Sequence, residues 1–357
     1  MNNKVIFVIS ALGGGGAERV LLSLANEMSL RGTEVRILKT GWKSGAYALR
    51  PEITLIQVPK YTCSAPLKAL RMLTFMRGVF REHADYTVIS FLSDNNMLSI
   101  LASLGLPNRV IVCERNDPSR NCTNALLRRV RNLIYRLADG SVFQTEDMRD
   151  YFAPSIRRKG TVIPNPVLID DGVYATVAAG AVPQKRVLAA GRLTPQKNYP
   201  MLIRAFAIVH RSCPDYNLEI YGSGELESEL RGEISEAGLD QVITIHPFSD
   251  DIYRLMKEST VYVSSSDYEG ISNTMLEAMA LGVPTVVTDC PIGGARLMVR
   301  NEENGLLVPV GDEEAMAAAL IRLLKDEGLR ERLSAASVRI RQDYGIEKIT
   351  DQWMEIL

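Results

Sequence analysis

The sequence predicts an α/β protein made of two successive doubly wound domains. Three observations favour this class. Short β-branched apolar runs alternate with longer amphipathic segments, the alternation stops at a proline-containing stretch near the middle of the chain, and it then restarts. A chain of 357 residues also exceeds what one ordinary core requires. We expect domains at 1–168 and 169–344, facing a central cleft that would be the default place for a site.

The first domain opens with a predicted strand at Val5–Ser10, an amphipathic helix at Ala17–Leu30 and a strand at Glu34–Lys39. This order is typical of a β-α-β unit in a parallel sheet. Further strands are expected at Thr87–Phe91, Arg109–Cys113, Gly140–Gln144 and Gly160–Ile163. Two prolines in Val162–Val167 then interrupt regular structure, and the small, polar stretch Asp170–Pro183 is the expected linker.

The second domain repeats the alternation. Strands are expected at Lys185–Leu193, Leu218–Gly222, Val242–His246, Thr260–Ser264 and Pro284–Asp289, with helices between them. A last helix at 345–357 lies beyond the expected complement of this domain. We expect it to cross back to the first domain.

Composition places the chain among folded proteins without a membrane span. Apolar residues make up 46% and charged residues 23%, and no stretch approaches the ~18 apolar residues of a spanning helix. The apolar run after Lys4 is short and ends in glycines, so it predicts a buried strand rather than a secretory leader. Five scattered cysteines without a C-x-x-C pair indicate reduced thiols rather than a disulfide framework or a zinc site. We expect a cytoplasmic protein, peripheral to the membrane at most.

Charge is distributed unevenly along the chain. Residues 1–180 carry 23 basic and 15 acidic side chains, a balance of +8, whereas the remainder carries 18 and 27, a balance of −9. Two basic amphipathic stretches, Pro66–Arg81 and Ala125–Leu137, belong to the basic half. They predict association with an anionic membrane surface. The alternatives are solvated surface charge and apolar faces that simply pack on the sheet.

The glycine-rich segment GGGGAER (Gly13–Arg19) joins the first predicted strand to the first predicted helix. Backbone amides of such a loop, together with the helix dipole, favour a phosphate at the helix start. The spacing is not a dinucleotide fingerprint, since Glu18 and Arg19 stand where that motif needs its third glycine. A tight strand-to-helix turn without a ligand is the alternative.

The segment GRLTPQKN places Arg192 and Lys197 just beyond the first strand of the second domain. Ligands of open α/β sheets bind at that edge, and two cations across one turn can converge on a diphosphate. They would stabilise the charge that builds up as a leaving group departs. Two solvated surface cations are the alternative.

The segment Ser264–Asp289 carries Glu269 in a loop and Glu277 eight residues later in a predicted helix. Carboxylates in fixed positions accept hydrogen bonds from sugar and ribose hydroxyls. The alternative is a helix-capping role for Glu269 and a solvated helix position for Glu277.

The chain resembles the retaining GT-B glycosyltransferases of family four over nearly its whole length. The resemblance rests on GGAERVL, IPNPV, GRLTPQKN and the pair of glutamates with EAMALGVP behind them, in this order. It implies that Arg192 and Lys197 hold the donor diphosphate, that Glu269 contacts the transferred sugar and that Glu277 binds the ribose. It also implies donor contacts from Gly15, Gly16, Gly270, Ile271, Ser272 and Asn273.

Two segments depart from the family pattern. Many relatives carry a histidine in the first domain where this chain has Glu114 and Arg115, which are therefore the candidates on the acceptor side. The segment HPFSDDI lacks a glycine that is common in the family, and Phe248 and Ser249 are expected there beside the nucleobase.

The resemblance implies transfer of a hexose or N-acetylhexosamine from a nucleotide diphosphate sugar, expected to be a UDP-sugar, to a lipid-linked glycan. No cofactor and no metal are expected, because the Arg192 and Lys197 pair can supply the charge of a metal ion. A nucleic-acid partner is not expected. The alternatives are a sugar-nucleotide epimerase or phosphorylase of the same architecture, and a non-catalytic partner in a glycan-assembly complex.

Overall fold

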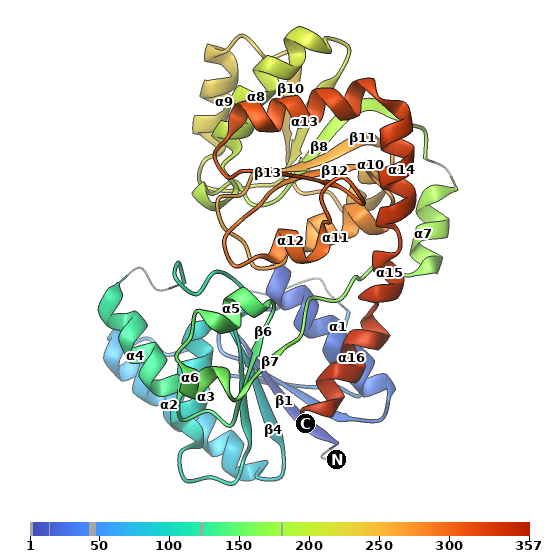
Figure 1. The fold of residues 1–357 in the computed structure, drawn as a ribbon. Helices are drawn as coiled ribbons and strands as arrows, with labels where there is room; N and C mark the ends of the chain where they lie inside the picture. Colours follow the sequence, from blue (N-terminus) through green and yellow to red (C-terminus); the bar gives the residue numbers. More distant parts are fainter. Residues whose placement is uncertain (1–2, 14, 43–47, 122–123, 180) are drawn as a thin grey trace. The chain divides into compact units, whose positions relative to one another are not determined.

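The computed structural model describes residues 3–13, 15–42, 48–121, 124–179 and 181–357. The chain forms two compact units. The first comprises Met1–Pro166 together with Ile346–Leu357, and the second comprises Val167–Gly345. Figure 1 shows that each unit is a sheet covered by helices.

Seven strands in the described part of the first unit form a parallel sheet in the order β3-β2-β1-β4-β5-β6-β7. The central strands are buried almost throughout because helices cover both faces. The strands are β1 (Lys4–Ile9), β2 (Glu34–Lys39), β3 (Thr54–Gln57), β4 (Thr87–Phe91), β5 (Val110–Cys113), β6 (Gly140–Phe143) and β7 (Gly160–Val162).

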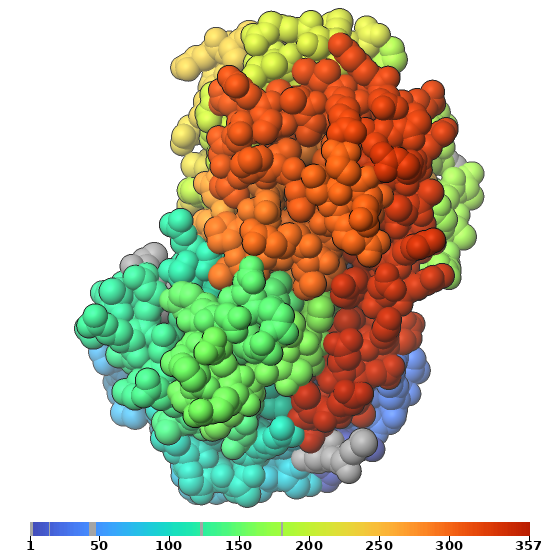
Figure 2. All heavy atoms as spheres, in the orientation of Figure 1, coloured from blue at the N-terminus to red at the C-terminus, as the bar shows by residue number. Residues whose placement is uncertain are grey.

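The helices of the first unit lie in two groups. In Figure 1, α2, α3 and α4 lie beside one face of the sheet, and α1 and α16 beside the other. The segment 124–137, which contains α4, forms part of the outer surface of this unit (Figure 2). The helices are α1 (Gly16–Leu30), α2 (Ala65–Glu82), α3 (Ser93–Ser103), α4 (Ala125–Tyr135), α5 (Glu146–Asp150), α6 (Pro154–Arg157) and α16 (Ile346–Glu355).

The last helix, α16, is an integral part of the first unit. Trp353 is fully buried and stacks on Phe91, with ring centroids 6.0 Å apart. Arg31, the residue after α1, donates hydrogen bonds to the Asp351 carboxylate at 2.5 Å and to the Glu347 carbonyl at 2.9 Å. The chain therefore completes its first core with its last residues.

Six strands in the described part of the second unit form a parallel sheet in the order β10-β9-β8-β11-β12-β13. This is the strand order of a doubly wound nucleotide-binding fold. The strands are β8 (Gln184–Ala190), β9 (Asn217–Tyr221), β10 (Ile243–His246), β11 (Ser259–Ser264), β12 (Thr285–Thr288) and β13 (Leu306–Val308). The strand order reverses between β8 and β11. Sheets of this kind bind ligands at the carboxyl ends of the two strands that flank the reversal.

The second unit also contains a short 3₁₀ turn and nine described helices outside the sheet. The turn, Pro195–Lys197, follows β8 directly. The helices are α7 (Asp171–Ala178), α8 (Tyr199–Ser212), α9 (Glu227–Glu236), α10 (Ile252–Lys257), α11 (Asn273–Ala280), α12 (Gly294–Met298), α13 (Glu313–Lys325), α14 (Glu327–Ser337) and the single-turn α15 (Ile340–Asp343), which joins α14 to the end of the unit.

The stretch expected to be an irregular linker contains α7, so that expectation is wrong. Asp170 caps the helix, its carboxylate accepting a hydrogen bond from the Val173 amide at 2.7 Å. The Arg341 guanidinium lies 3.9 Å from the centre of the Tyr174 ring. No residue of α7 is fully buried, which explains why the sequence shows no apolar periodicity there.

None of the helices in the described ranges combines the length and the apolar character needed to cross a membrane.

Candidate functional site

The two segments with the clearest chemical signal lie at one edge of the second sheet. Arg192 and Lys197 follow β8, and Glu269 follows β11, which is the neighbouring strand. Both strands are parallel, so both loops leave the sheet at its carboxyl edge. This is the point where the strand order reverses, and doubly wound sheets bind ligands there.

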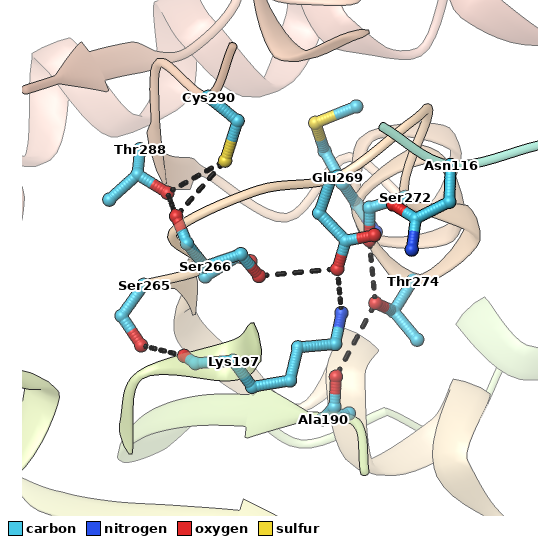
Figure 3. Close-up of polar contacts among 12 residues, drawn as sticks. Asn116, Ala190, Lys197, Ser265, Ser266, Glu269, Ser272, Thr274, Thr288 and Cys290 are labelled. Carbon is cyan, nitrogen blue, oxygen red and sulfur yellow. Dashed lines mark hydrogen bonds and ion pairs between the residues drawn. The ribbon is translucent and has the colours of Figure 1, made fainter. Parts of the chain in front are cut away.

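Lys197 and Glu269 form an ion pair at this edge. The Lys197 ammonium donates a hydrogen bond to Oε1 of Glu269, and the Ser266 hydroxyl donates to the same oxygen at 3.2 Å (Figure 3). Their side chains are only 15% and 17% exposed. Lys197 is therefore not a solvated surface cation.

Backbone and side-chain hydrogen bonds tie the two loops together. The Ser265 hydroxyl donates to the Lys197 carbonyl at 2.8 Å, as Figure 3 shows. The Asp267 amide donates to the Gln196 carbonyl at 2.9 Å, and the Asn198 amide group donates to the Asp267 carboxylate at 2.6 Å. The position of the ion pair is therefore set by the loops around it and not only by its own attraction.

Arg192 differs from Lys197 in being exposed. Within the residues that the structure describes, its guanidinium has no hydrogen-bond or ion-pair partner. The Arg192 guanidinium is therefore exposed, only five residues before Lys197 in the chain, and it can offer five N–H donors to an anionic ligand.

Glu277 lies on α11 and is 1% exposed. The Tyr253 hydroxyl, from α10, donates to its carboxylate at 3.5 Å. The helix cap is Ser272, whose hydroxyl accepts from the Met275 amide, rather than Glu269. The structure thus excludes both the capping role of Glu269 and the solvated position of Glu277.

Glu269 and Glu277 both raise the pKa of one buried phenol, that of Tyr262. Burial is the main reason that the pKa of Tyr262 is raised, and the negative charges of Glu269 and Glu277 raise it further. The Tyr262 hydroxyl donates to Thr274 at 2.8 Å. The two carboxylates therefore lie within electrostatic reach of the same point at the carboxyl end of β11.

A small pocket is lined by Glu269 and by the segment that leads into α11. Gly270 and Ser272 belong to its wall, and Ile271 and Asn273 continue that segment into the helix. The lining residues are Ser264, Ser266, Glu269, Gly270, Ser272, Met275, Val287, Thr288, Cys290 and Ala295.

Cys290 in this pocket is a hydrogen-bond donor rather than a nucleophile. Its thiol donates to the Ser266 carbonyl at 3.0 Å, and Thr288 donates to the same oxygen at 2.6 Å. Burial raises the pKa of the Cys290 thiol to about 12, so the thiol stays protonated at neutral pH.

The nucleobase candidates Phe248 and Ser249 follow β10 at the same edge of the sheet. The Phe248 ring is 65% exposed, and the Ser249 hydroxyl accepts a hydrogen bond from the Asp251 amide at 3.2 Å. An exposed aromatic ring at a ligand-binding edge can stack on a base. Their contact with a base remains a prediction.

In the first unit, Gly15 and Gly16 lie where β1 leads into α1. The Gly15 amide donates a hydrogen bond to the Glu18 carboxylate at 3.1 Å. The chain thus supplies its own anion to this helix start, and a phosphate would have to displace it.

Glu114 and Arg115 follow β5 and are held by their neighbours. Buried Glu114 accepts hydrogen bonds from Ser93 at 3.0 Å, from Asn121 at 2.8 Å and from the Tyr135 phenol. Burial raises the pKa of this carboxyl, and Arg131 and these hydrogen bonds oppose the rise.

The Arg115 guanidinium donates to Asn165 and lies 5.0 Å from the centre of the Phe91 ring. Burial lowers its pKa to about 10. Both side chains therefore organise the loop after β5, and their roles toward an acceptor remain predictions.

Comparison with solved structures shows the fold. The Staphylococcus aureus protein TarM superposes with a TM-score of 0.81 over 99% of both chains, at 13% identity. Anabaena HepE in complex with UDP and glucose superposes with a TM-score of 0.80 over 99% of this chain and 98% of that one, at 19% identity. The expected GT-B α/β fold is confirmed.

Comparison of sequences shows the family. The family described as glycosyl transferases group 1 matches residues 179–339, and glycosyltransferase family 4 matches residues 14–171. A Campylobacter jejuni relative, N-acetylgalactosamine-N,N'-diacetylbacillosaminyl-diphospho-undecaprenol 4-alpha-N-acetylgalactosaminyltransferase, is 31% identical over 93% of this chain and 92% of its own length. The chain belongs to the GT-B glycosyltransferases. An uncharacterised glycosyltransferase of Haemophilus influenzae is 27% identical to this transferase over 99% of both chains.

Sequence reasoning missed the residues that hold the transferase's ion pair in place. Ser265, Ser266 and Asp267 all contribute hydrogen bonds to the loops around Lys197 and Glu269. The signal was present as the polar run SSSD directly after a β-branched strand. Such runs are also common in ordinary turns, so only the facing loop identifies their partners.

Gly294 has no side chain, which lets the backbone at Gly270, next to Glu269, pack directly against it. A Cβ atom there would lie 1.8 Å from the Gly270 carbonyl oxygen, so Gly294→Ala must displace the backbone beside Glu269. We expect activity to fall at least about tenfold and the melting temperature to drop, because packed backbone cannot absorb such an overlap. Donor hydrolysis and thermal melting measure both effects. Gly232→Ala is the control, since nothing lies within 4 Å of the added atom on α9, and wild-type activity in Gly294→Ala would contradict the expectation.

Proposed function

We propose that this transferase moves a hexose or N-acetylhexosamine from a UDP-sugar to a lipid-linked glycan, with retention of anomeric configuration. The observation that carries the proposal is the Lys197–Glu269 ion pair at the carboxyl edge where the second sheet reverses its strand order. The exposed Arg192 stands in the same loop as Lys197. Such an edge with two cations suits a nucleotide diphosphate.

Transfer needs stabilisation of charge on the leaving diphosphate. In the proposed reaction, the acceptor hydroxyl oxygen bonds to the anomeric carbon while the bond from that carbon to the diphosphate breaks. The bonding electrons leave with UDP, and the hydroxyl proton passes to the departing phosphate oxygen. Attack and departure occur on one face of the sugar, so the configuration is retained.

In this reaction the protein acts by position and electrostatics. Lys197 and Arg192 would bind the diphosphate oxygens more tightly as charge develops on them. Glu269 would accept hydrogen bonds from the transferred sugar, and Glu277 from the ribose. Because Glu277 is enclosed, ribose binding requires the side chains that cover it to move.

We propose that no metal ion is needed, because two cationic side chains supply the positive charge at the diphosphate. In the part of the chain that the structure describes, no three histidine, cysteine, aspartate or glutamate side chains gather as a metal site requires. The test is turnover with and without a strong chelator.

The names of relatives support the class of acceptor. Two Campylobacter jejuni relatives are named as N-acetylgalactosaminyltransferases that act on diphospho-undecaprenol-linked sugars, and an Erwinia amylovora relative is named for amylovoran biosynthesis. A lipid-linked acceptor would place this transferase at the cytoplasmic face of a membrane.

The experiment offers a panel of UDP-, GDP- and ADP-sugars together with lipid-diphosphate-linked oligosaccharides. We expect transfer from one UDP-sugar, unaffected by chelator, with an α-linked product from an α-linked donor. Proton NMR of the new anomeric signal measures the configuration. An inverted product, a chelator-sensitive reaction, or conversion of the donor sugar into its epimer would each contradict part of the proposal.

A further inference from the structure

Arg115 carries buried hydrogen-bond donors that the first unit does not use. Its Nε and Nη1 atoms are buried and, among the residues that the structure describes, have no hydrogen-bond partner. Its Nη2 atom donates to the side-chain oxygen of Asn165, which is uncharged. Because Nε and Nη1 carry most of the N–H groups of a guanidinium, most of the donor capacity of Arg115 is unused.

The surroundings of Arg115 do not neutralise its charge. Burial lowers its pKa, and Cys113 opposes this effect only weakly, since burial raises the pKa of that thiol far above neutral and keeps it uncharged. The adjacent carboxylate of Glu114 accepts its hydrogen bonds from other side chains. The Phe91 ring, with its centre 5.0 Å away, offers a cation–π contact, which returns less free energy than burial of an unpaired charge costs.

Arg131, on α4, is a buried arginine of the same unit whose donors are all used. It is fully buried, and each nitrogen atom of its guanidinium donates a hydrogen bond, one of them to the Pro118 carbonyl at 2.7 Å. Burial raises the pKa of Glu114, and the charge of Arg131 opposes that rise. Arg131 was expected among the surface cations, and the structure corrects that expectation. Its contacts explain why Arg131 is buried, whereas those of Arg115 leave its charge unexplained.

Arg115 also lies where open parallel sheets bind ligands. It follows β5 at the carboxyl edge of the first sheet, and β5 pairs with β4, one of the two strands that flank the reversal of strand order. At the end of β4, Leu92 has a φ of 76°, which is uncommon for leucine. Such backbone conformations persist where the surrounding structure imposes them, and they cluster at binding sites.

We propose that Arg115 binds a phosphate of the acceptor, in the diphosphate that links the glycan to its lipid. The inference rests on the proposed function in one respect, namely that the acceptor carries such a diphosphate. A guanidinium recognises phosphate oxygens through charge-assisted hydrogen bonds, and the phosphate would supply the missing negative charge. The donor diphosphate is assigned to Arg192 and Lys197 of the second unit, which leaves the acceptor as the substrate for Arg115. Because Nε and Nη1 are covered, binding requires the groups that cover them to move.

The first test is calorimetric titration of the full chain with geranyl diphosphate, in saturating UDP that fills the proposed donor site. We expect binding, and Arg115→Met should weaken it at least about tenfold because it removes hydrogen bonds between charged groups. Arg115→Lys keeps the charge without the planar donors and should recover part of the affinity. Arg109→Met is the matched control, since Arg109 is exposed and precedes β5, at the opposite edge of the sheet. It should bind geranyl diphosphate as the wild type does.

Two further ligands identify the group that is recognised. Geraniol has the chain of geranyl diphosphate without its phosphates, and we expect it not to bind. Geraniol binding as tight as that of geranyl diphosphate would show that the phosphates are not recognised. Glucuronate presents a carboxylate instead of a phosphate. If glucuronate bound more tightly than geranyl diphosphate, and through Arg115, the ligand would be an anionic sugar and the assignment to a diphosphate would be wrong.

Thermal melting separates a binding role of Arg115 from a structural one. Without ligand, Arg115→Met should melt at the wild-type temperature or above it, because methionine removes an unpaired charge and keeps a long apolar side chain beside Phe91. Arg131→Met should melt well below the wild type, since it takes a cation away from buried Glu114. Geranyl diphosphate should raise the melting temperature of the wild type but not that of Arg115→Met.

Two results would overturn the role of Arg115. One is a lack of geranyl diphosphate binding by the wild type, or equally tight binding by Arg115→Met. The other is melting of Arg115→Met as far below the wild type as that of Arg131→Met, which would make Arg115 a structural residue. These measurements do not depend on turnover. Binding through Arg115 without transfer to a lipid-linked glycan would contradict the proposed function alone, whereas transfer by Arg115→Met with the wild-type KM for the acceptor would contradict the present inference alone.

Discussion

Replacing Lys197 with alanine is expected to lower turnover about 100-fold, which corresponds to ~3 kcal/mol of barrier. The ammonium is held at the carboxyl edge of β8 by Glu269 and by the hydrogen bonds that join the two loops. A preorganised cation needs little rearrangement when charge develops on the diphosphate, so its loss should appear mainly in kcat. Arg192→Ala should act in the same direction. Steady-state kinetics with saturating donor measures both effects.

Lys185→Ala is the matched control for Lys197→Ala. Lys185 lies at the amino end of β8, the strand that Lys197 follows, and its ion pair with Asp215 at 2.7 Å is solvated. Activity should be unchanged, since exposed ion pairs contribute about 0–1 kcal/mol and this one is remote from the carboxyl edge. Unchanged thermal melting of Arg192→Ala would show that its fold is intact. Near-normal turnover in both Lys197→Ala and Arg192→Ala would remove these residues from the mechanism.

The structure adds a test that separates the roles of the two paired residues. If Glu269 acts only by positioning Lys197, the double variant Lys197→Ala with Glu269→Ala should be no slower than Lys197→Ala alone. If Glu269 also contacts the transferred sugar, as proposed, the double variant should be slower. Single-turnover rates of the four proteins measure the coupling.

Glu277→Ala is expected to weaken UDP binding by about tenfold to about a hundredfold. A hydrogen bond to a charged group contributes about 1.5–3 kcal/mol, and the proposed partner of Glu277 is the ribose that UDP itself carries. Glu269→Ala should leave UDP affinity undiminished, because UDP has no transferred sugar and the freed Lys197 can turn to phosphate. Calorimetric titration with UDP alone measures the difference.

Glu277→Gln controls for the volume of this buried side chain. It should retain the fold while losing much of the acceptor strength of the carboxylate. Tyr253→Phe removes the 3.5 Å contact to Glu277 without touching the carboxylate, and it should bind UDP nearly as the wild type does. An equal loss of UDP affinity in Glu269→Ala and Glu277→Ala would show that the two roles are wrongly divided.

The parts of the fold that follow from local pattern were predictable. The strands at the centre of both sheets are buried on both faces, so they read as short β-branched runs between helical segments. The edge strands β3 and β13 were not expected. Most of β3 is partly exposed and β13 has only three residues, so neither has a run long enough to predict a strand.

In the candidate site, the charged residues were predictable from the sequence, whereas the partners that they contact were not. Arg192, Lys197 and Glu269 could be chosen because they are charged residues in the loops that follow predicted strands, where ligands of such sheets bind. Glu277 could be chosen from its spacing to Glu269 and from the family resemblance. Their partners could not be chosen. Lys197 and Glu269 are 72 residues apart in the chain, and only the adjacency of β8 and β11 makes them neighbours.

By itself the sequence determined the α/β class, the two repeats of the alternating pattern and the chemical groups at the strand ends, because period, turn residues and charge are local properties. The tertiary structure decided which groups meet. It paired Lys197 with Glu269 and enclosed Glu277. It also turned Arg131 inward, so that α4 faces outward with leucines. The physical reason is that burial and pairing depend on contacts between segments distant in sequence, and no local pattern contains them.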